Sequence, residues 1–220
     1  MASRAEQKAR TRNALINSWL RIIGGGANFA SVSLREVAKT AGVVPTSFYR
    51  HFGDMDELGL AVIDQLGLDL RRMMRGSFET DESLDDVIHH SVDAYQQYVL
   101  DNADLVLFVD QARTGGAASL RAAIGDELEF FSTRIAGALR EVVPGLKPAD
   151  RDTVAQLILA ALLNNTTTLL ALPSNSDTRR DELKDELVRK MQVIMLGAVQ
   201  LSATKPPVRK RATRARGSAK

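Results

Sequence analysis

The sequence predicts an all-α protein in which a small N-terminal helical domain precedes a larger helical one. Apolar residues recur every three or four positions in each long segment, which is the spacing of helices with one buried face. Glycine and proline clusters divide the chain into segments of helical length, and no alternating pattern long enough for a strand occurs. With 220 residues, 45% hydrophobic and 25% charged, the chain can bury a sizeable core.

The first three expected helices are short and well delimited. Residues 6–24 form the first, ended by the glycine run at 24–26. Ser33 and Glu36 have the spacing of a capping box at the start of the second, and Gly42 ends it. Pro45 suits the first turn of the third. The remaining helices are expected near residues 54–74, 82–101, 103–112, 117–142, 149–171 and 181–202.

Charge is strongly segregated along the chain, although the net charge is only +2. Residues 1–53 carry eight Lys and Arg against two Glu, and residues 205–220 carry seven cations and no acid. The acidic residues therefore lie almost entirely between them. This pattern predicts a polyanionic partner for the two ends, unless each run is only a solvated surface. The tail has little to bury and is expected to be disordered; it either adds phosphate attraction or has no effect.

The stretch 45–52 predicts a DNA-reading helix. On a helix, Phe48 and Phe52 share one face and can pack inward, which turns Thr46 and Arg50 outward. Hydroxyls, a phenol and a guanidinium then form the outer surface. A capped helix, a tight turn and such a polar helix make a helix-turn-helix, whose second helix fits the major groove. The alternative is a plain helical hairpin with a solvated face.

Catalytic and metal-binding patterns are not found in the sequence. Cysteine is absent, adjacent His89 and His90 would point about 100° apart on a helix, and no phosphate-binding glycine loop occurs. We therefore predict no enzyme activity, no metal and no cofactor. The charged N-terminus is not a secretory signal, and the apolar stretch 154–172 is broken by polar residues 164–168, so we expect a buried helix and a cytoplasmic protein.

The stretch "SLREVAKTAGVVPTSFYRHFGDMDEL" (33–58) resembles the DNA-binding signature of the TetR family of bacterial transcriptional regulators. "RTGGAASLRAAIGDELEFF" (113–131) resembles the fatty-acid-responsive FabR/DesT group within that family. The resemblance implies a helix-turn-helix domain at 1–53 and a ligand-binding and dimerisation domain at 54–204, whose first helix, about 54–74, links the two. The basic tail at 205–220 follows.

The residues expected to meet DNA come from the second and third helices. The resemblance places Pro45, Thr46 and Ser47 near bases, Tyr49 and His51 at phosphates, and Arg35 at either. The outward face of the third helix adds the Arg50 guanidinium, and the capped start of the second helix at Ser33 can contact a phosphate. The full set is Ser33, Arg35, Pro45, Thr46, Ser47, Tyr49, Arg50 and His51.

A ligand cavity between helices is expected in the second domain, although plain core packing is the alternative for its apolar residues. The resemblance implies a long-chain acyl thioester, as acyl-CoA or acyl carrier protein, with Arg113 and Arg121 near its head group. The expected apolar lining is Leu105, Phe108, Val109, Phe130, Phe131, Leu159 and Leu163.

The last two long helices carry more apolar surface than one small domain needs, which predicts a homodimer through them; core packing is again the alternative. The residues concerned include Leu157, Leu183, Leu187, Met191, Met195 and Val199. Together with the resemblance, this predicts a repressor of fatty-acid or unsaturated-lipid genes that binds a palindromic operator. The alternatives are a TetR-type repressor that answers a drug or another apolar effector, an architectural DNA-compacting protein, and a small enzyme.

Overall fold

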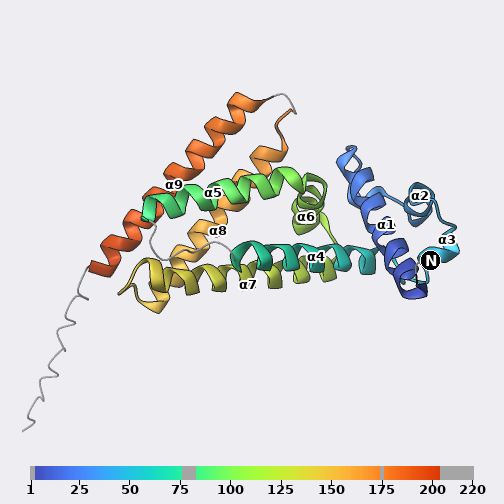
Figure 1. Ribbon diagram of the computed structural model, residues 1–220, viewed down its shortest axis with the longest axis horizontal. Helices are drawn as coiled ribbons and strands as arrows, with labels where there is room; N and C mark the ends of the chain where they lie inside the picture. The colour runs from blue at the N-terminus through green and yellow to red at the C-terminus, as the bar shows by residue number, and fades with distance from the viewer. Residues whose placement is uncertain (1–2, 76–82, 174–175, 204–220) are drawn as a thin grey trace, which may run out of the picture.

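The computed structural model describes residues 3–75, 83–173 and 176–203, and the predicted tail at 205–220 lies outside them. Every regular element in this described part is a helix, which confirms the all-α prediction (Figure 1). The elements are α1 (Arg4–Gly24), the 3₁₀ turn η1 (Phe29–Ser31), α2 (Leu34–Thr40), α3 (Pro45–Phe48), α4 (Met55–Arg75), α5 (Leu84–Asp101), α6 (Ala103–Gly115), α7 (Ala118–Val142), α8 (Pro148–Leu170) and α9 (Asp177–Ala203).

The helix boundaries lie within four residues of the sequence prediction. The Ser3 side chain accepts from the Glu6 N–H at 3.2 Å, and Glu6 Oε2 accepts from the Ser3 N–H at 2.9 Å. This full capping box starts α1 two residues earlier than predicted. At the end of the chain, α9 begins at Asp177 rather than residue 181, and an Arg180–Asp177 hydrogen bond of 2.7 Å lies in its first turn.

The connection between α2 and α3 has the predicted geometry. Ser33 Oγ accepts from the Glu36 N–H at 3.2 Å at the start of α2. Gly42 has φ +69°, a left-handed conformation that glycine adopts without steric cost, and it ends the helix. This turn brings α3 against α2 and α1 as a compact three-helix unit (Figure 1).

Two hydrophobic cores hold the chain together. One joins α1–α4, α6 and the start of α7, and the other lies among α5, α7, α8 and α9. α4 runs alongside α7 (Figure 1), where Gly59 permits close approach. A Cβ at Gly59 would lie 2.9 Å from Leu120 Cδ2, so a larger residue would require the Leu120 side chain to shift.

The first core crosses from the N-terminal helices into the second domain through three aromatic rings. The Trp19 and Phe108 centroids are 4.9 Å apart, and Phe29 lies edge-on to Phe108 at 5.6 Å. Edge-on and tilted pairs at these separations are favourable. Because Phe108 belongs to α6, this helix is anchored directly to α1 and η1.

In the described part of the chain, α8 has the length and apolar composition of a membrane-crossing helix, which by itself is weak evidence. α8 packs against α7 and α9, and buried Asn165 donates to the Leu183 carbonyl at 3.3 Å. A core helix meets the same length and composition test.

Candidate nucleic-acid interface and apolar cavity

α3 is fixed by two phenylalanines beneath it. Phe48 and Phe52 are 0% and 2% exposed, and their ring centroids are 5.6 Å apart. The α-helix is shorter than predicted, since it covers Pro45–Phe48 rather than eight residues. Hydrogen-bonded turns extend it, with the N–H groups of His51 and Phe52 donating to the Phe48 carbonyl at 2.8 and 3.0 Å. The two rings therefore still share one face.

The opposite face of α3 is open to solvent. Thr46 and Arg50 are exposed, Ser47 is half-buried, and Tyr49 is 63% exposed. In the free chain these side chains contribute little to the core. Their hydroxyls, phenol and guanidinium are groups that contact base edges and phosphates.

The remaining predicted DNA contacts lie around this face. Pro45 is the first residue of α3 and is exposed, and Arg35 is exposed on α2. Ser33 is exposed, but its hydroxyl oxygen already accepts a hydrogen bond as the cap of α2. Its hydroxyl hydrogen can still be donated to a phosphate.

His51 lies at the edge of the face, with two basic residues of α1 close to it. Its Nδ1 is buried without a hydrogen-bond partner in the described part of the chain. Burial, and after it the positive charges of Lys8, Arg12 and Arg50, lower the pKa of His51 below its ordinary value. Our sequence prediction omitted Lys8 and Arg12. Their four-residue spacing, which puts both on one side of α1, is a signal that could have found them.

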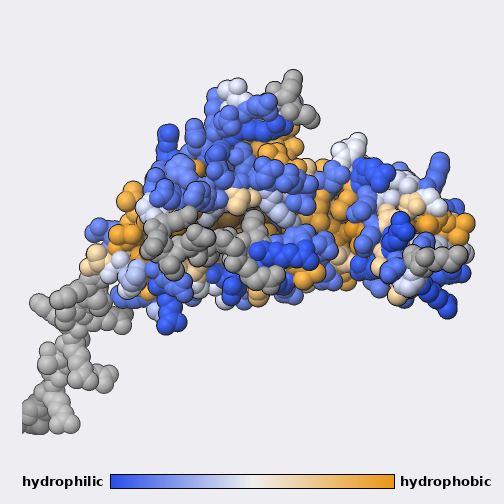
Figure 2. All heavy atoms as spheres, viewed as in Figure 1, coloured by the Kyte–Doolittle hydropathy of each residue, from blue (hydrophilic) through white to orange (hydrophobic). Residues whose placement is uncertain are grey.

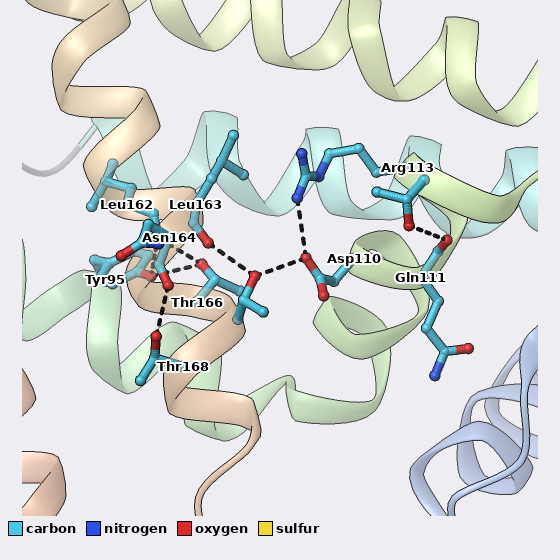
Figure 3. A network of polar contacts seen from close by, with 11 residues as sticks. Tyr95, Asp110, Gln111, Arg113, Leu162, Leu163, Asn164, Thr166 and Thr168 are labelled. Carbon is cyan, nitrogen blue, oxygen red and sulfur yellow. Dashed lines mark hydrogen bonds and ion pairs between the residues drawn. The ribbon is translucent and has the colours of Figure 1, made fainter.

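An apolar cavity of about 170 Å³ lies among α5, α7, α8 and α9. No charged side chain is among the residues that line it. Tyr95 contributes its ring, and its hydroxyl lies 2.8 Å from the Leu162 carbonyl and 2.7 Å from Thr166 Oγ1 (Figure 3). Burial raises the pKa of Tyr95 to about 12, so this phenol stays protonated.

Most residues predicted to bind the ligand lie elsewhere. Phe131 lines the cavity, whereas Leu105, Phe108, Val109, Phe130, Leu159 and Leu163 do not. Phe108 instead fills the core at the junction with α1, and Phe130 stacks under the Arg71 guanidinium at 4.6 Å. Apolar periodicity indicates that a residue is buried, but it does not indicate which packing space the residue faces.

The two arginines expected at the head group also lie outside the cavity lining. Arg113 pairs with Asp110 at 3.4 Å (Figure 3), and Arg121 donates to the Gly116 carbonyl. The first contact lies within α6, and the second joins α7 to the α6–α7 connection. Residues that line the cavity and that we did not select include Tyr95, Leu139, Met191 and Met195.

Comparisons with known proteins agree with this geometry. Residues 26–62 match the family described as bacterial regulatory proteins, tetR family. This part of the N-terminal domain is therefore similar to the tetR family of bacterial regulatory proteins. The matched residues contain the whole of α2, the turn and α3, together with the first part of α4.

Solved structures show that the TetR-type fold extends over most of the chain. A transcriptional regulator from Rhodococcus sp. Rha1 is 18% identical, with a TM-score of 0.69 over 87% of this chain and 97% of that one. FadR, a fatty acid degradation regulator from Bacillus halodurans, is 14% identical, with a TM-score of 0.69 over 85% and 95%. FadR from Bacillus subtilis in complex with stearoyl-CoA is 15% identical, with a TM-score of 0.62 over 80% and 97%.

In this TetR-type fold, an apolar stripe remains exposed on α8 and α9. It consists of Leu157, Val193, Leu196, Val199 and Leu201, of which Val193 and Leu196 are 65% and 67% exposed. Figure 2 shows apolar atoms at the end of the molecule where the C-terminal half of α9 lies. Leu183, Leu187, Met191 and Met195, which we had assigned to a dimer surface, are instead buried within the protomer.

Proposed function

We propose that this protein is a cytoplasmic transcriptional repressor that binds a palindromic DNA operator as a homodimer. The observation that carries the proposal is the exposed face of α3, held in place by Phe48 and Phe52 beneath it. A short helix in this setting presents hydroxyl and cationic groups to the major groove. The TetR-family match over residues 26–62 supports the same reading.

The exposed stripe on α8 and α9 supports the homodimer. Large apolar side chains such as Val193 and Leu196 are costly to leave in water when they gather on one face. A two-fold axis through this stripe would bury it against its own copy. The two α3 helices would then address half-sites about 34–36 Å apart, one turn of duplex.

The effector we propose is a long-chain acyl thioester bound through its chain in the second domain. The cavity is apolar, and each buried methylene contributes about 0.8 kcal/mol. The resemblance of residues 113–131 to the FabR/DesT group points to fatty acids, and the FadR structure with stearoyl-CoA is a similar fold that holds such a ligand. Genes of fatty-acid or unsaturated-lipid metabolism are the corresponding targets.

The size of the cavity requires it to widen for such a chain. At about 170 Å³ it is smaller than the roughly 300–1,000 Å³ usual for ligand pockets. Met191 and Met195 line it, and methionine side chains rearrange readily. The effector would bind the protein with the wide cavity more tightly than the protein with the narrow one. If the two cavity widths correspond to two spacings of the α3 helices in the dimer, effector binding changes the affinity for DNA.

The alternative effector is a small neutral apolar compound such as a drug. The cavity size favours it directly, because an engineered apolar cavity of about 150 Å³ in another protein binds benzene without rearrangement. The uncharged lining also suits a ligand without an ionised head group.

The experiment has two steps. The first selects duplexes from a random library with the full-length protein, and recovery of an inverted repeat is expected. The second measures affinity for the selected duplex with acyl-CoAs of several chain lengths, and with benzene as the small apolar probe. A response that grows with chain length supports the acyl thioester, and a response only to benzene supports the alternative. Recovery of no preferred sequence would refute the repressor.

A variant that fills the cavity provides the control for the second step. Ala138 lines the cavity, and Ala138→Phe places a ring in it. The variant should keep the affinity of the wild-type protein for the selected duplex and lose the response to effector. If it responds like wild type, the effector binds elsewhere.

A further inference from the structure

The first turns of α1 carry a row of cations that the core does not explain. Arg4, Lys8 and Arg12 follow one another at four-residue intervals and so lie along one side of the helix. All three are exposed, and the buried residues of α1 begin only at Leu15. These three side chains therefore lie on the solvent side of α1 and are not part of its buried face.

The row runs beside the recognition helix. The Arg12 guanidinium lies over the Phe52 ring, 5.2 Å from its centroid, and Phe52 anchors the turn after α3. Lys8, Arg12 and Arg50 are all close enough to His51 to disfavour its protonation. Figure 1 shows the start of α1 next to α3. Cations from α1 and from the turn after α3 thus converge at one end of the candidate DNA face.

In the part of the chain that the structure describes, the charges of these cations are not paired with a carboxylate. Among residues 3–75, 83–173 and 176–203, no ion pair involves Lys8, Arg12 or Arg50. The acid nearest in sequence to Lys8 and Arg12 is Glu6, whose carboxylate accepts from the Ser3 N–H in the capping box. Like charges held together without a counter-ion favour an external anion.

The neighbouring start of α4 cannot take that anion. Asp54 Oδ1 accepts from the Glu57 N–H at 2.8 Å, and Glu57 Oε2 accepts from the Gly53 N–H at 2.6 Å. Asp56 adds a further negative charge in the first turn. The carboxylates at the start of α4 thus occupy N–H groups there and repel phosphate. A phosphate on this side of the domain must therefore be bound by other groups.

We propose that Lys8, Arg12 and Arg50 form a phosphate-binding site that holds the DNA backbone beside the groove contacted by α3. This inference rests on the proposed function and adds two α1 residues to the DNA interface. The ligand is a backbone phosphate of duplex DNA, and the site positions the protein without reading sequence. Each phosphate neutralised releases counter-ions and steepens the dependence of log K on log salt by about 0.9.

The test compares full-length variants on the duplex selected by the wild-type protein and on a scrambled duplex. Lys8→Ala and the pair Lys8→Ala with Arg12→Gln remove the site, and Arg10→Ala is the matched control. Arg10 is also exposed and cationic, but it lies about 200° around α1 from Lys8. Circular dichroism melting confirms that each variant is folded.

The double variant should reduce the salt slope by about 1–2 and weaken binding to both duplexes by similar factors. Arg10→Ala should leave the slope near that of wild type. An unchanged slope in the double variant, or an equal reduction in Arg10→Ala, overturns the site. If the wild-type protein selects no DNA sequence, the proposed function is wrong. If it selects a sequence but the salt slopes of the variants differ from those expected, only the phosphate-binding site is wrong.

Discussion

The backbone N–H of Phe29 donates to Gln111 Oε1 at 3.1 Å, across 82 positions of the chain. This bond joins η1 in the DNA-binding unit to α6 in the second domain. One residue before Gln111, Asp110 accepts from Thr167 Oγ1 of α8 at 3.1 Å, and Thr166 of α8 contacts Tyr95 at the cavity (Figure 3). α6 therefore has polar contacts to both α8 and the DNA-binding unit.

Gln111→Leu should weaken the junction. The variant leaves the Phe29 N–H without its partner, and an unsatisfied buried donor costs about 1–3 kcal/mol. We expect a loss of that order in the free energy of unfolding, measured by urea denaturation. Gln97→Leu, a substitution of an exposed glutamine on α5, is the control and should change stability by less than about 0.5 kcal/mol. Equal losses in the two variants would contradict the role of the junction.

Phe52→Ala should remove the support of α3. The side chain is 2% exposed and packs on Phe48 and under Arg12, so truncation leaves a cavity and should cost about 3–5 kcal/mol. Thermal melting followed by circular dichroism measures the effect. Tyr49→Ala, at an exposed position on the same segment, should melt near wild type. A Phe52→Ala protein as stable as wild type would show that the Phe52 side chain does not hold α3 in place.

Tyr49→Phe should weaken DNA binding without changing stability. The substitution removes only the hydroxyl of an exposed ring, so the folded chain is unaffected. If that hydroxyl meets a phosphate, affinity should fall by similar factors for the selected and scrambled duplexes. Arg35→Ala on α2 tests the second predicted contact in the same assay. Unchanged affinity in both variants would remove this face from the DNA interface.

His51 should make the protein less stable in mild acid. Its pKa is lowered in the folded chain, chiefly by burial and then by Lys8, Arg12 and Arg50, so the unfolded chain binds more protons below about pH 6.5. The free energy of unfolding should therefore fall as pH falls through that value, and His51→Gln should flatten the decline. The measurement is urea denaturation between pH 7.5 and 5.

Leu196→Glu should convert a dimer to a monomer. Leu196 is 67% exposed on the α8–α9 stripe. At a two-fold contact, each protomer would bury one glutamate carboxylate, and the two charges would repel each other. Light scattering should report half the mass of wild type. Leu68→Glu changes another exposed leucine, on α4, and should leave the mass unaltered. A wild-type mass for Leu196→Glu would place the dimer contact elsewhere.

The local features of the DNA-binding unit could be predicted from sequence because each depends on neighbouring residues. Phe48 and Phe52 are four residues apart, which fixes their common face, and Gly42 supplies a conformation that other residues avoid. The three-helix unit and most later helices were therefore predicted to within a few residues. The capping box at Ser3 was equally local and was missed.

The lining of the apolar cavity could not be predicted from sequence because it depends on contacts distant in sequence. Phe108 and Phe131 are both apolar residues of helices, but one fills the junction with Trp19 and the other lines the cavity. Likewise Leu187 and Leu196 lie on the same helix, and only the packing of α9 against α5 and α8 makes the first buried and the second exposed.

The sequence by itself determined the helices, the charge segregation and the polar face of the third helix, since periodicity, caps and turn residues act within a few positions. The tertiary structure decided which apolar residues face the cavity, which face solvent, and how Lys8 and Arg12 come to lie beside α3. The physical reason is that an apolar helix face gains free energy by burial against any well-packed neighbour. Which neighbour covers it is decided only when the helices pack together.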